Sequence, residues 1–150
     1  MPDIITEFMK KTSLPLDEPS GESQGLPQPP LAWEPGEDAE LIDLPEPPAV
    51  QLAPVDLPKL IEKRRTLRRY APDPLTLAEL SYLLWATQGV KFVTPRPVTL
   101  RTVPSAGARH AFETLLLINR VEGVEPGLYH YAALQHKLAV VTREPDIAAR

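Results

Sequence analysis

Residues 114–118 read Thr114-Leu115-Leu116-Leu117-Ile118, and two more apolar runs follow at Leu128-Tyr129-His130-Tyr131 and Leu138-Ala139-Val140-Val141. The first run is continuously apolar, which is typical of a strand buried on both faces. The second run alternates as a half-buried strand does, and the third is its predicted hairpin partner across Gln135-His136-Lys137. A glycine-containing turn at residues 122–127 separates the first strand from this hairpin. The C-terminal third of the chain is therefore predicted to form a strand and a hairpin.

The first of three predicted helices starts at residue 56. Asp56-Leu57-Pro58 places an N-cap aspartate before a proline in the first helical turn. The helix should fade between Thr66 and Tyr70, because Pro72 and Pro74 cannot continue it.

The second predicted helix starts with Thr76-Leu77-Ala78-Glu79, which matches a capping box. Leucines at positions 77, 80, 83 and 84 give it one apolar face, and Gly89 is expected to be a left-handed C-cap. Residues 91–103 mix β-branched residues with prolines and bases, so we expect a loop there. Because helices and strands segregate along the chain instead of alternating, the predicted fold class is α+β.

Length and composition limit the kinds of protein that this chain can be. Its 150 residues suit one domain, and 43% hydrophobic with 24% charged residues is typical of a soluble globular protein. No apolar run is long enough to span a bilayer, and Met1–Glu7 does not resemble a signal peptide. The absence of cysteine excludes disulfides, a thiolate nucleophile and zinc–sulfur sites. We expect a cytoplasmic protein with no membrane partner.

Acidic residues and prolines concentrate in the first third of the chain. Residues 1–58 carry twelve acids against two lysines, a net charge of −10, whereas residues 59–150 carry +6. Twelve of the nineteen prolines also lie in residues 1–58, which argues against a helix or a central strand there. We predict that residues 1–55 form a proline-rich arm, extended from residue 12 onward. It would lie across the fold or a partner subunit, helped by the opposite charges.

Four arginines form the densest basic cluster, at Arg64, Arg65, Arg68 and Arg69. Arginine offers a planar fork of donors that suits phosphate, and the first three could converge on one anion at a helix end. A solvated basic face explains the same cluster without any ligand. A nucleic-acid partner is disfavoured, because the whole chain is acidic and no aromatic residues interleave with the bases.

A second candidate element is the small-residue segment Pro104-Ser105-Ala106-Gly107, which precedes the first predicted strand. Small residues let backbone amides approach a ligand, and glycine permits a positive φ, although an ordinary turn has the same composition. His110, His130 and His136 have no metal-binding spacing, so we expect structural roles for them and no metal site. The chain has no Walker loop, dinucleotide fingerprint or Ser-His-Asp order, and we assign no catalytic side chain.

The sequence resembles the FMN-dependent nitroreductase family in three segments that occur in the same order. These are Arg64-Arg65-Thr66-Leu67-Arg68, the helix end at Trp85-Ala86-Thr87-Gln88-Gly89, and Pro104–Gly107. The resemblance covers residues 55–140 and is closest to the SagB/thiazole-oxidase-type branch. It implies helices around an antiparallel-rich sheet, in a tight homodimer. It also implies that FMN is held by Arg64, Arg65, Thr66 and Arg68 of one subunit and by Pro104, Ser105, Ala106 and Gly107 of the other.

The resemblance further implies a ping-pong transfer of hydride from NAD(P)H to a nitro compound or quinone. Peptide-modifying members of the branch instead oxidise azolines to azoles, and the sequence does not separate the two activities. Family members usually run well past 150 residues, and the last predicted helix starts at Asp146 and stops after one turn. We therefore expect residues 56–150 to be the N-terminal part of the domain. A third possibility is a non-catalytic fragment that serves subunit association.

Overall fold

The computed structural model describes residues 3–13, 19, 21–50, 54–96, 98–144 and 147. The chain divides into two compact units, Met1–Pro30 and Leu31–Arg150. The first unit contains α1 (Ile4–Thr12), where the sequence analysis predicts no helix. Asp3 caps this helix by accepting a hydrogen bond from the Ile5 amide at 3.1 Å. No side chain of α1 is buried.

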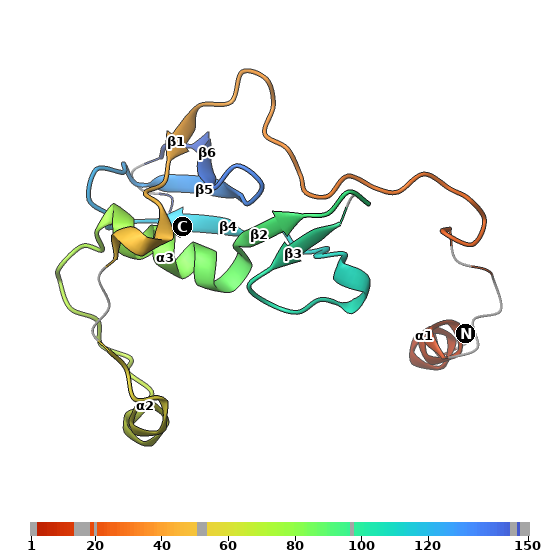
Figure 1. Ribbon diagram of the computed structural model, residues 1–150, viewed down its shortest axis with the longest axis horizontal. Coiled ribbons are helices and arrows are strands. Elements are labelled where there is room, and N and C mark those ends of the chain that lie inside the picture. Colours follow the sequence, from red (N-terminus) through yellow and green to blue (C-terminus); the bar gives the residue numbers. More distant parts are fainter. Residues whose placement is uncertain are drawn as a thin grey trace. The chain divides into compact units, whose positions relative to one another are not determined.

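The second unit has the predicted α+β organisation, built on a four-stranded antiparallel sheet in the order β1-β6-β5-β4 (Figure 1). Its centre is the predicted hairpin of β5 (Gly127–Ala132) and β6 (Lys137–Thr142), in which Tyr131 lies opposite Leu138. β5 is more deeply buried than the predicted half-buried strand, because other elements cover both of its faces. Tyr129, Tyr131 and Leu138 are almost completely inaccessible to solvent.

The strand β4 (Leu115–Ile118) exists as predicted, but it is not buried on both faces. Among the described residues it pairs only with β5, at one edge of the sheet. Ile118 and Leu116 pack into the core, whereas Leu115 and Leu117 are 54% and 49% exposed. The continuous apolar run was therefore misleading about burial, because only one face of β4 is covered.

The opposite edge of the sheet is β1 (Leu41–Asp43), which lies within the predicted arm. Ile42 pairs with Leu138 of β6, and Leu44 is part of the core. Prolines exclude a central strand, but a three-residue edge strand fits between Pro35 and Pro45. A short 3-10 helix, η1 (Pro47–Ala49), follows and contacts α3. Residues 31–50 thus belong to the same compact unit as the sheet.

The helices predicted to start at residues 56 and 76 are both present. α2 (Leu57–Lys63) starts at the Asp56 N-cap as expected, ends before residue 66 and has no buried side chain. α3 (Leu77–Gln88) has the predicted capping box, in which the Glu79 amide donates to Thr76 Oγ1 at 3.2 Å and the Thr76 amide donates to Glu79 Oε2 at 2.9 Å. Its Leu80 and Leu84 pack on the sheet.

Gly89 is not the expected left-handed cap, since its φ is −59° and its ψ is 133°. The position instead needs glycine for space. A Cβ there would lie 2.5 Å from the carbonyl oxygen of Trp85 and would also overlap the indole ring. The chain therefore leaves α3 directly into an extended segment.

That extended segment is a strand, so the expectation of a loop over residues 91–103 was wrong. β2 (Val90–Val93) and β3 (Thr99–Arg101) form a separate antiparallel hairpin, with Val93 opposite Thr99 and a bulge at Lys91. Pro95 lies in the connection between the strands, where it removes no ladder hydrogen bond. The β-branched residues on either side were the relevant signal.

The predicted helix start at Asp146 lies outside the described residues. Within the ranges that the structure describes, no helix has the length and apolar character needed to span a bilayer.

Candidate functional site

The arginine cluster follows α2 directly. The Arg64 amide caps the helix by donating to the Leu60 carbonyl at 2.9 Å, and Arg65, Thr66 and Arg68 continue as exposed, non-helical chain. Within the described part of the protein, Arg64, Arg65 and Arg68 form no ion pair. Their guanidinium groups are therefore open to an external anion.

The chain beyond this cluster is tied to the end of β4. The Arg120 guanidinium donates to the carbonyls of Ala71 and Pro72 at 3.2 and 2.9 Å. Leu75 forms a parallel bridge with Val121, with hydrogen bonds to Arg120 and Glu122. A cavity of about 570 Å³ opens here, and its lining includes Tyr70, Leu75, Leu80, Leu116, Leu117 and Arg120. Tyr70 brings the end of the arginine-rich stretch to this cavity, but none of the four predicted FMN contacts at residues 64–68 lines it.

The second predicted element lies in the connection between β3 and β4, residues 102–114, here called the Pro104 loop. Pro104, Ser105, Ala106 and Gly107 are all exposed, and η2 (Ala106–Ala108) forms a single 3-10 turn. Gly107 has a φ of 60°, the positive value for which its glycine was singled out. Ala108 and His110 also have positive φ values, 52° and 45°, which are uncommon for residues with a Cβ.

Ser105 organises this loop. Its carbonyl accepts from the Ala108 amide at 3.1 Å, and its hydroxyl oxygen accepts from the His110 amide at 2.9 Å. Because the hydroxyl oxygen acts as the acceptor in this contact, its own proton can be donated to a ligand. The loop thus presents a hydroxyl donor among small side chains.

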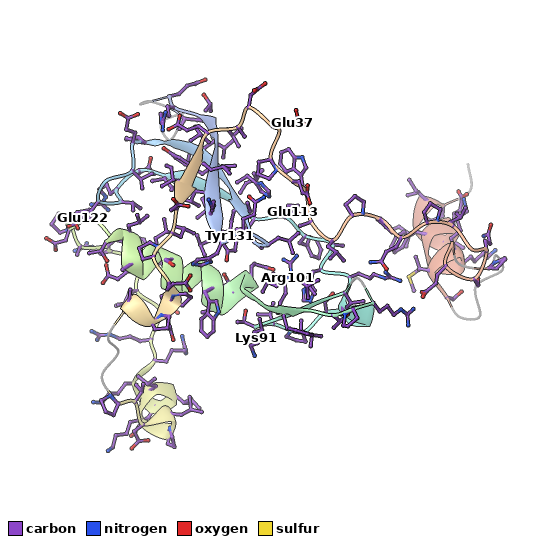
Figure 2. All side chains as sticks on the ribbon, turned by 45° about the horizontal axis from the view of Figure 1, so that its top comes forward. Glu37, Lys91, Arg101, Glu113, Glu122 and Tyr131 are labelled. Carbon is purple, nitrogen blue, oxygen red and sulfur yellow. The ribbon has the colours of Figure 1, made fainter. Side chains whose placement is uncertain are left out.

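A polar network that the sequence analysis did not identify supports the loop. Glu113 Oε1 accepts from the Trp33 amide at 2.7 Å, and Glu113 Oε2 lies 3.0 Å from His130 Nε2. The Trp33 ring packs on the His130 ring with centroids 4.7 Å apart. The Arg101 guanidinium donates to the Leu31 carbonyl at 3.4 Å. Figure 2 shows Arg101 and Glu113 in the same region of the second unit.

Burial changes the pKa values of Arg101 and His110. Arg101 is 8% exposed, and its burial lowers the pKa of the guanidinium, with Glu113 and Tyr131 acting in the opposite direction. Arginine nevertheless stays protonated in proteins. Burial, followed by the charge of Arg101, lowers the pKa of His110. The neutral form of His110 is therefore favoured, and Arg101 is a buried positive charge close to the loop.

A second buried chain of hydrogen bonds connects β5 to α3. Tyr131 Oη lies 2.8 Å from His136 Nδ1, and His136 Nε2 lies 2.8 Å from Ser81 Oγ. Ser81 gives its proton to the Pro45 carbonyl, so His136 Nε2 must be the donor toward Ser81. Burial raises the pKa of Tyr131 to about 12, which keeps this phenol protonated as a donor. His136 thus links β5 to α3, whereas His130 is bonded to Glu113.

The structure does not bring the two predicted sets together. In the described residues of this single chain, no hydrogen bond or ion pair joins residues 64–68 to residues 104–107, and no described cavity is lined by both. The described residues also contain no group of three His, Asp or Glu side chains placed to hold a metal ion.

Comparison with known proteins identifies the family. Residues 61–149 match the model of the Nitroreductase family, a range that contains both predicted elements. A curated protein of Methanocaldococcus jannaschii, provisionally named a nitroreductase, is 38% identical over 90 residues, which cover 60% of this chain and 43% of that protein. The matched region thus spans less than half the length of this relative. Because the family match covers more than half of the chain, the chain belongs to the nitroreductase family.

Proposed function

We propose that this protein is an FMN-dependent oxidoreductase that transfers hydride between NAD(P)H and an electron-poor acceptor, a nitro compound or a quinone. Membership of the nitroreductase family supports an oxidoreductase. The observation that carries the cofactor assignment is the set of three exposed arginines, Arg64, Arg65 and Arg68, which have no ion pair within the described residues. Such a set provides charge-assisted donors for a phosphate group.

The proposed roles follow from the donor chemistry of the two elements. Arg64, Arg65 and Arg68 hold the phosphate, and the Thr66 hydroxyl adds a neutral donor to the same ligand. The Ser105 hydroxyl donates to a polar atom of the flavin, while Ala106 and Gly107 leave room for a flat ring. FMN, when bound, supplies the centre that accepts and returns hydride. The side chains of this protein bind and orient, which is consistent with the absence of an assigned catalytic side chain.

We further propose a homodimer in which each site combines the arginines of one subunit with the Pro104 loop of the other. Both elements are exposed, and within the described part of one chain no hydrogen bond or ion pair joins them. NAD(P)H and the acceptor would occupy the same place in turn, which gives ping-pong kinetics.

A second candidate activity is the oxidation of an azoline to an azole in a modified peptide. It is supported by the adjacent Arg64 and Arg65 together with Pro104–Gly107, the features that are most similar to the SagB-type branch. Oxidation of NADH in the presence of a simple quinone can be measured as the loss of nicotinamide absorbance. Rapid oxidation would favour the quinone or nitro acceptor. No turnover with these acceptors, in a protein that does bind FMN, would favour the peptide substrate.

FMN binding is the direct test of the proposal. We expect purified protein to bind FMN, measured by equilibrium dialysis and by the change in flavin fluorescence. Arg65→Ala should weaken binding by about 1.5–3 kcal/mol, the usual contribution of a hydrogen bond to a charged group. Arg69→Ala is the matched control, because Arg69 lies in the same exposed cluster outside the proposed contacts. Absence of binding, or equal losses in both variants, would contradict the proposal.

A further inference from the structure

The two ends of the Pro104 loop belong to different sheets. The loop leaves β3 of the two-stranded sheet at Arg101 and enters β4 of the four-stranded sheet after Glu113. In the described residues, no strand pairing connects these two sheets. The spacing between the loop ends must therefore be fixed by something other than a β-ladder.

Residues 31–33, here called the strap, contact both ends. At one end, Arg101 Nη2 donates to the Leu31 carbonyl at 3.4 Å. At the other end, the Trp33 amide donates to Glu113 Oε1 at 2.7 Å. The second bond is short and involves a carboxylate, so it is the stronger of the two. The strap, Arg101, the loop and Glu113 thus form a closed ring.

Glu113 is held on its other side as well. Its Oε2 lies 3.0 Å from Nε2 of His130, which is 2% exposed and belongs to the central strand β5. The Trp33 ring covers the His130 ring, which adds a packing contact to the backbone hydrogen bond. One carboxylate therefore joins the strap to the middle of the sheet.

The loop needs such support, because its backbone is strained. Ala108 and His110 adopt left-handed conformations that are unfavourable for residues with a Cβ. Conformations of this kind persist only where the surroundings hold them in place. Within the loop, hydrogen bonds donated by the backbone amides of Ala108, Arg109 and His110 hold this turn.

We infer that the strap clamps the Pro104 loop through Arg101 and Glu113, and that Glu113 is a positioning residue for the ligand-binding conformation of the loop. The identity of the ligand rests on the proposed function, whereas the clamp itself does not. Glu113 acts through the strap and the loop ends and does not touch the ligand.

The clamp is tested by amide hydrogen exchange in the full chain. We expect Glu113→Ala to speed exchange of the Ala108 and His110 amides on the order of tenfold, because a hydrogen bond to a charged group is lost. Amides of α3 should be unchanged. Glu113→Gln keeps an acceptor for the Trp33 amide and should restore most of the protection. His130→Phe removes the other partner of Glu113 but keeps the strap bond, and it should speed exchange of the loop amides less than Glu113→Ala does.

Unchanged loop exchange in Glu113→Ala, with α3 also unchanged, would overturn the inference. So would a His130→Phe effect as large as that of Glu113→Ala, because the strap bond that His130→Phe keeps would then not hold the loop. If Glu113→Ala speeds exchange in every element, a comparison of loop exchange in Trp33→Pro and Trp33→Ala tests the clamp instead. Only the proline variant removes the amide donor, so equal loop exchange in these two variants would also overturn the clamp.

Binding of FMN separates this inference from the proposed function. If the wild-type chain binds FMN, Glu113→Ala should weaken binding about tenfold and Glu113→Gln should recover most of it. If the wild-type chain does not bind FMN, the proposed function fails, and the exchange experiment still decides whether the clamp exists.

Discussion

Tyr131 and His136 are joined by a hydrogen bond of 2.8 Å between the phenol oxygen and Nδ1, at opposite ends of the turn from β5 to β6. The two rings meet edge to face with centroids 5.7 Å apart. Since the other imidazole nitrogen donates toward Ser81, Nδ1 is unprotonated and has Tyr131 as its donor. A chain of hydrogen bonds from this phenol through His136 and Ser81 therefore connects the turn to α3 and to Pro45, in the segment after β1.

Removing this phenol oxygen should destabilise the fold. Tyr131→Phe leaves Nδ1 of His136 without its donor, which costs about 1–3 kcal/mol of unfolding free energy. Urea denaturation followed by fluorescence measures the change. Tyr70→Phe is the control, because Tyr70 is 83% exposed. A Tyr131→Phe protein as stable as the wild type would show that the hydrogen bond is not needed.

Because of the same phenol, we expect the unfolding free energy to fall at high pH. Burial raises the pKa of Tyr131 from 10.0 to about 12 in the folded protein. Between these values the unfolded state releases a proton that the folded state keeps, so the unfolding free energy falls as the pH rises from 10 to 12. The slope should approach 1.4 kcal/mol per pH unit, and Tyr131→Phe should lack this contribution. Parallel stability curves for the two proteins above pH 10 would argue against it.

Because of His110, we expect the protein to lose stability as the pH falls below neutrality. Its folded pKa is lowered from 6.5 by burial and then by Arg101. As the pH drops below about 6.5, the unfolded chain binds a proton before the folded chain does, and stability decreases. His110→Asn should flatten this decrease, since asparagine tolerates the positive φ of 45° and does not titrate in this range. Thermal unfolding between pH 7 and pH 5 provides the measurement, and equal slopes would contradict the assignment.

Gly89 and Gly36 give a matched pair of glycine substitutions. Gly89→Ala should cost about 1–3 kcal/mol or more, because the new Cβ would lie 2.5 Å from the Trp85 carbonyl oxygen and overlap the indole. At Gly36 an added Cβ meets nothing within 4 Å, so Gly36→Ala should change stability by only a few tenths of a kcal/mol. Chemical denaturation of both variants distinguishes a steric requirement from a general loss of backbone freedom, which would affect both alike.

Thr76 tests the cap of α3. Thr76→Ala removes the hydroxyl that accepts from the Glu79 amide and should cost about 1 kcal/mol. Thr76→Ser keeps the acceptor and should recover most of that stability. If both variants lose the same amount, the methyl group of Thr76 and not its hydroxyl supports the helix.

Local signals made the helices predictable, and distant partners made other features unpredictable. The capping box needs only Thr76 and Glu79, three residues apart, so the sequence is enough to find it. β1 exists because Ile42 meets Leu138, and no property of residues 41–43 alone indicates that partner. The prolines near β2 and β3 concealed a hairpin whose β-branched residues lie on either side of Pro95.

The candidate site shows the same division. Arg64–Arg68 and Pro104–Gly107 could be selected from the sequence, because each is a contiguous motif that resembles a known family. The bond between Trp33 and Glu113 joins residues 80 positions apart, and neither residue signals the other. Glu113 directly precedes the apolar run Thr114–Ile118, and this position gives no sign of its partners Trp33 and His130.

The exposed edge of β4 has a consequence for handling the protein. The strand β4 consists of four apolar residues and contains no lysine, proline or bulge that would discourage pairing with another strand. Within the described residues, only one edge of β4 is hydrogen-bonded to another strand. Such an edge is a template for intermolecular sheet growth. Soluble yield should therefore fall steeply with protein concentration and temperature, and a charged residue in place of Leu117 should delay the onset of turbidity.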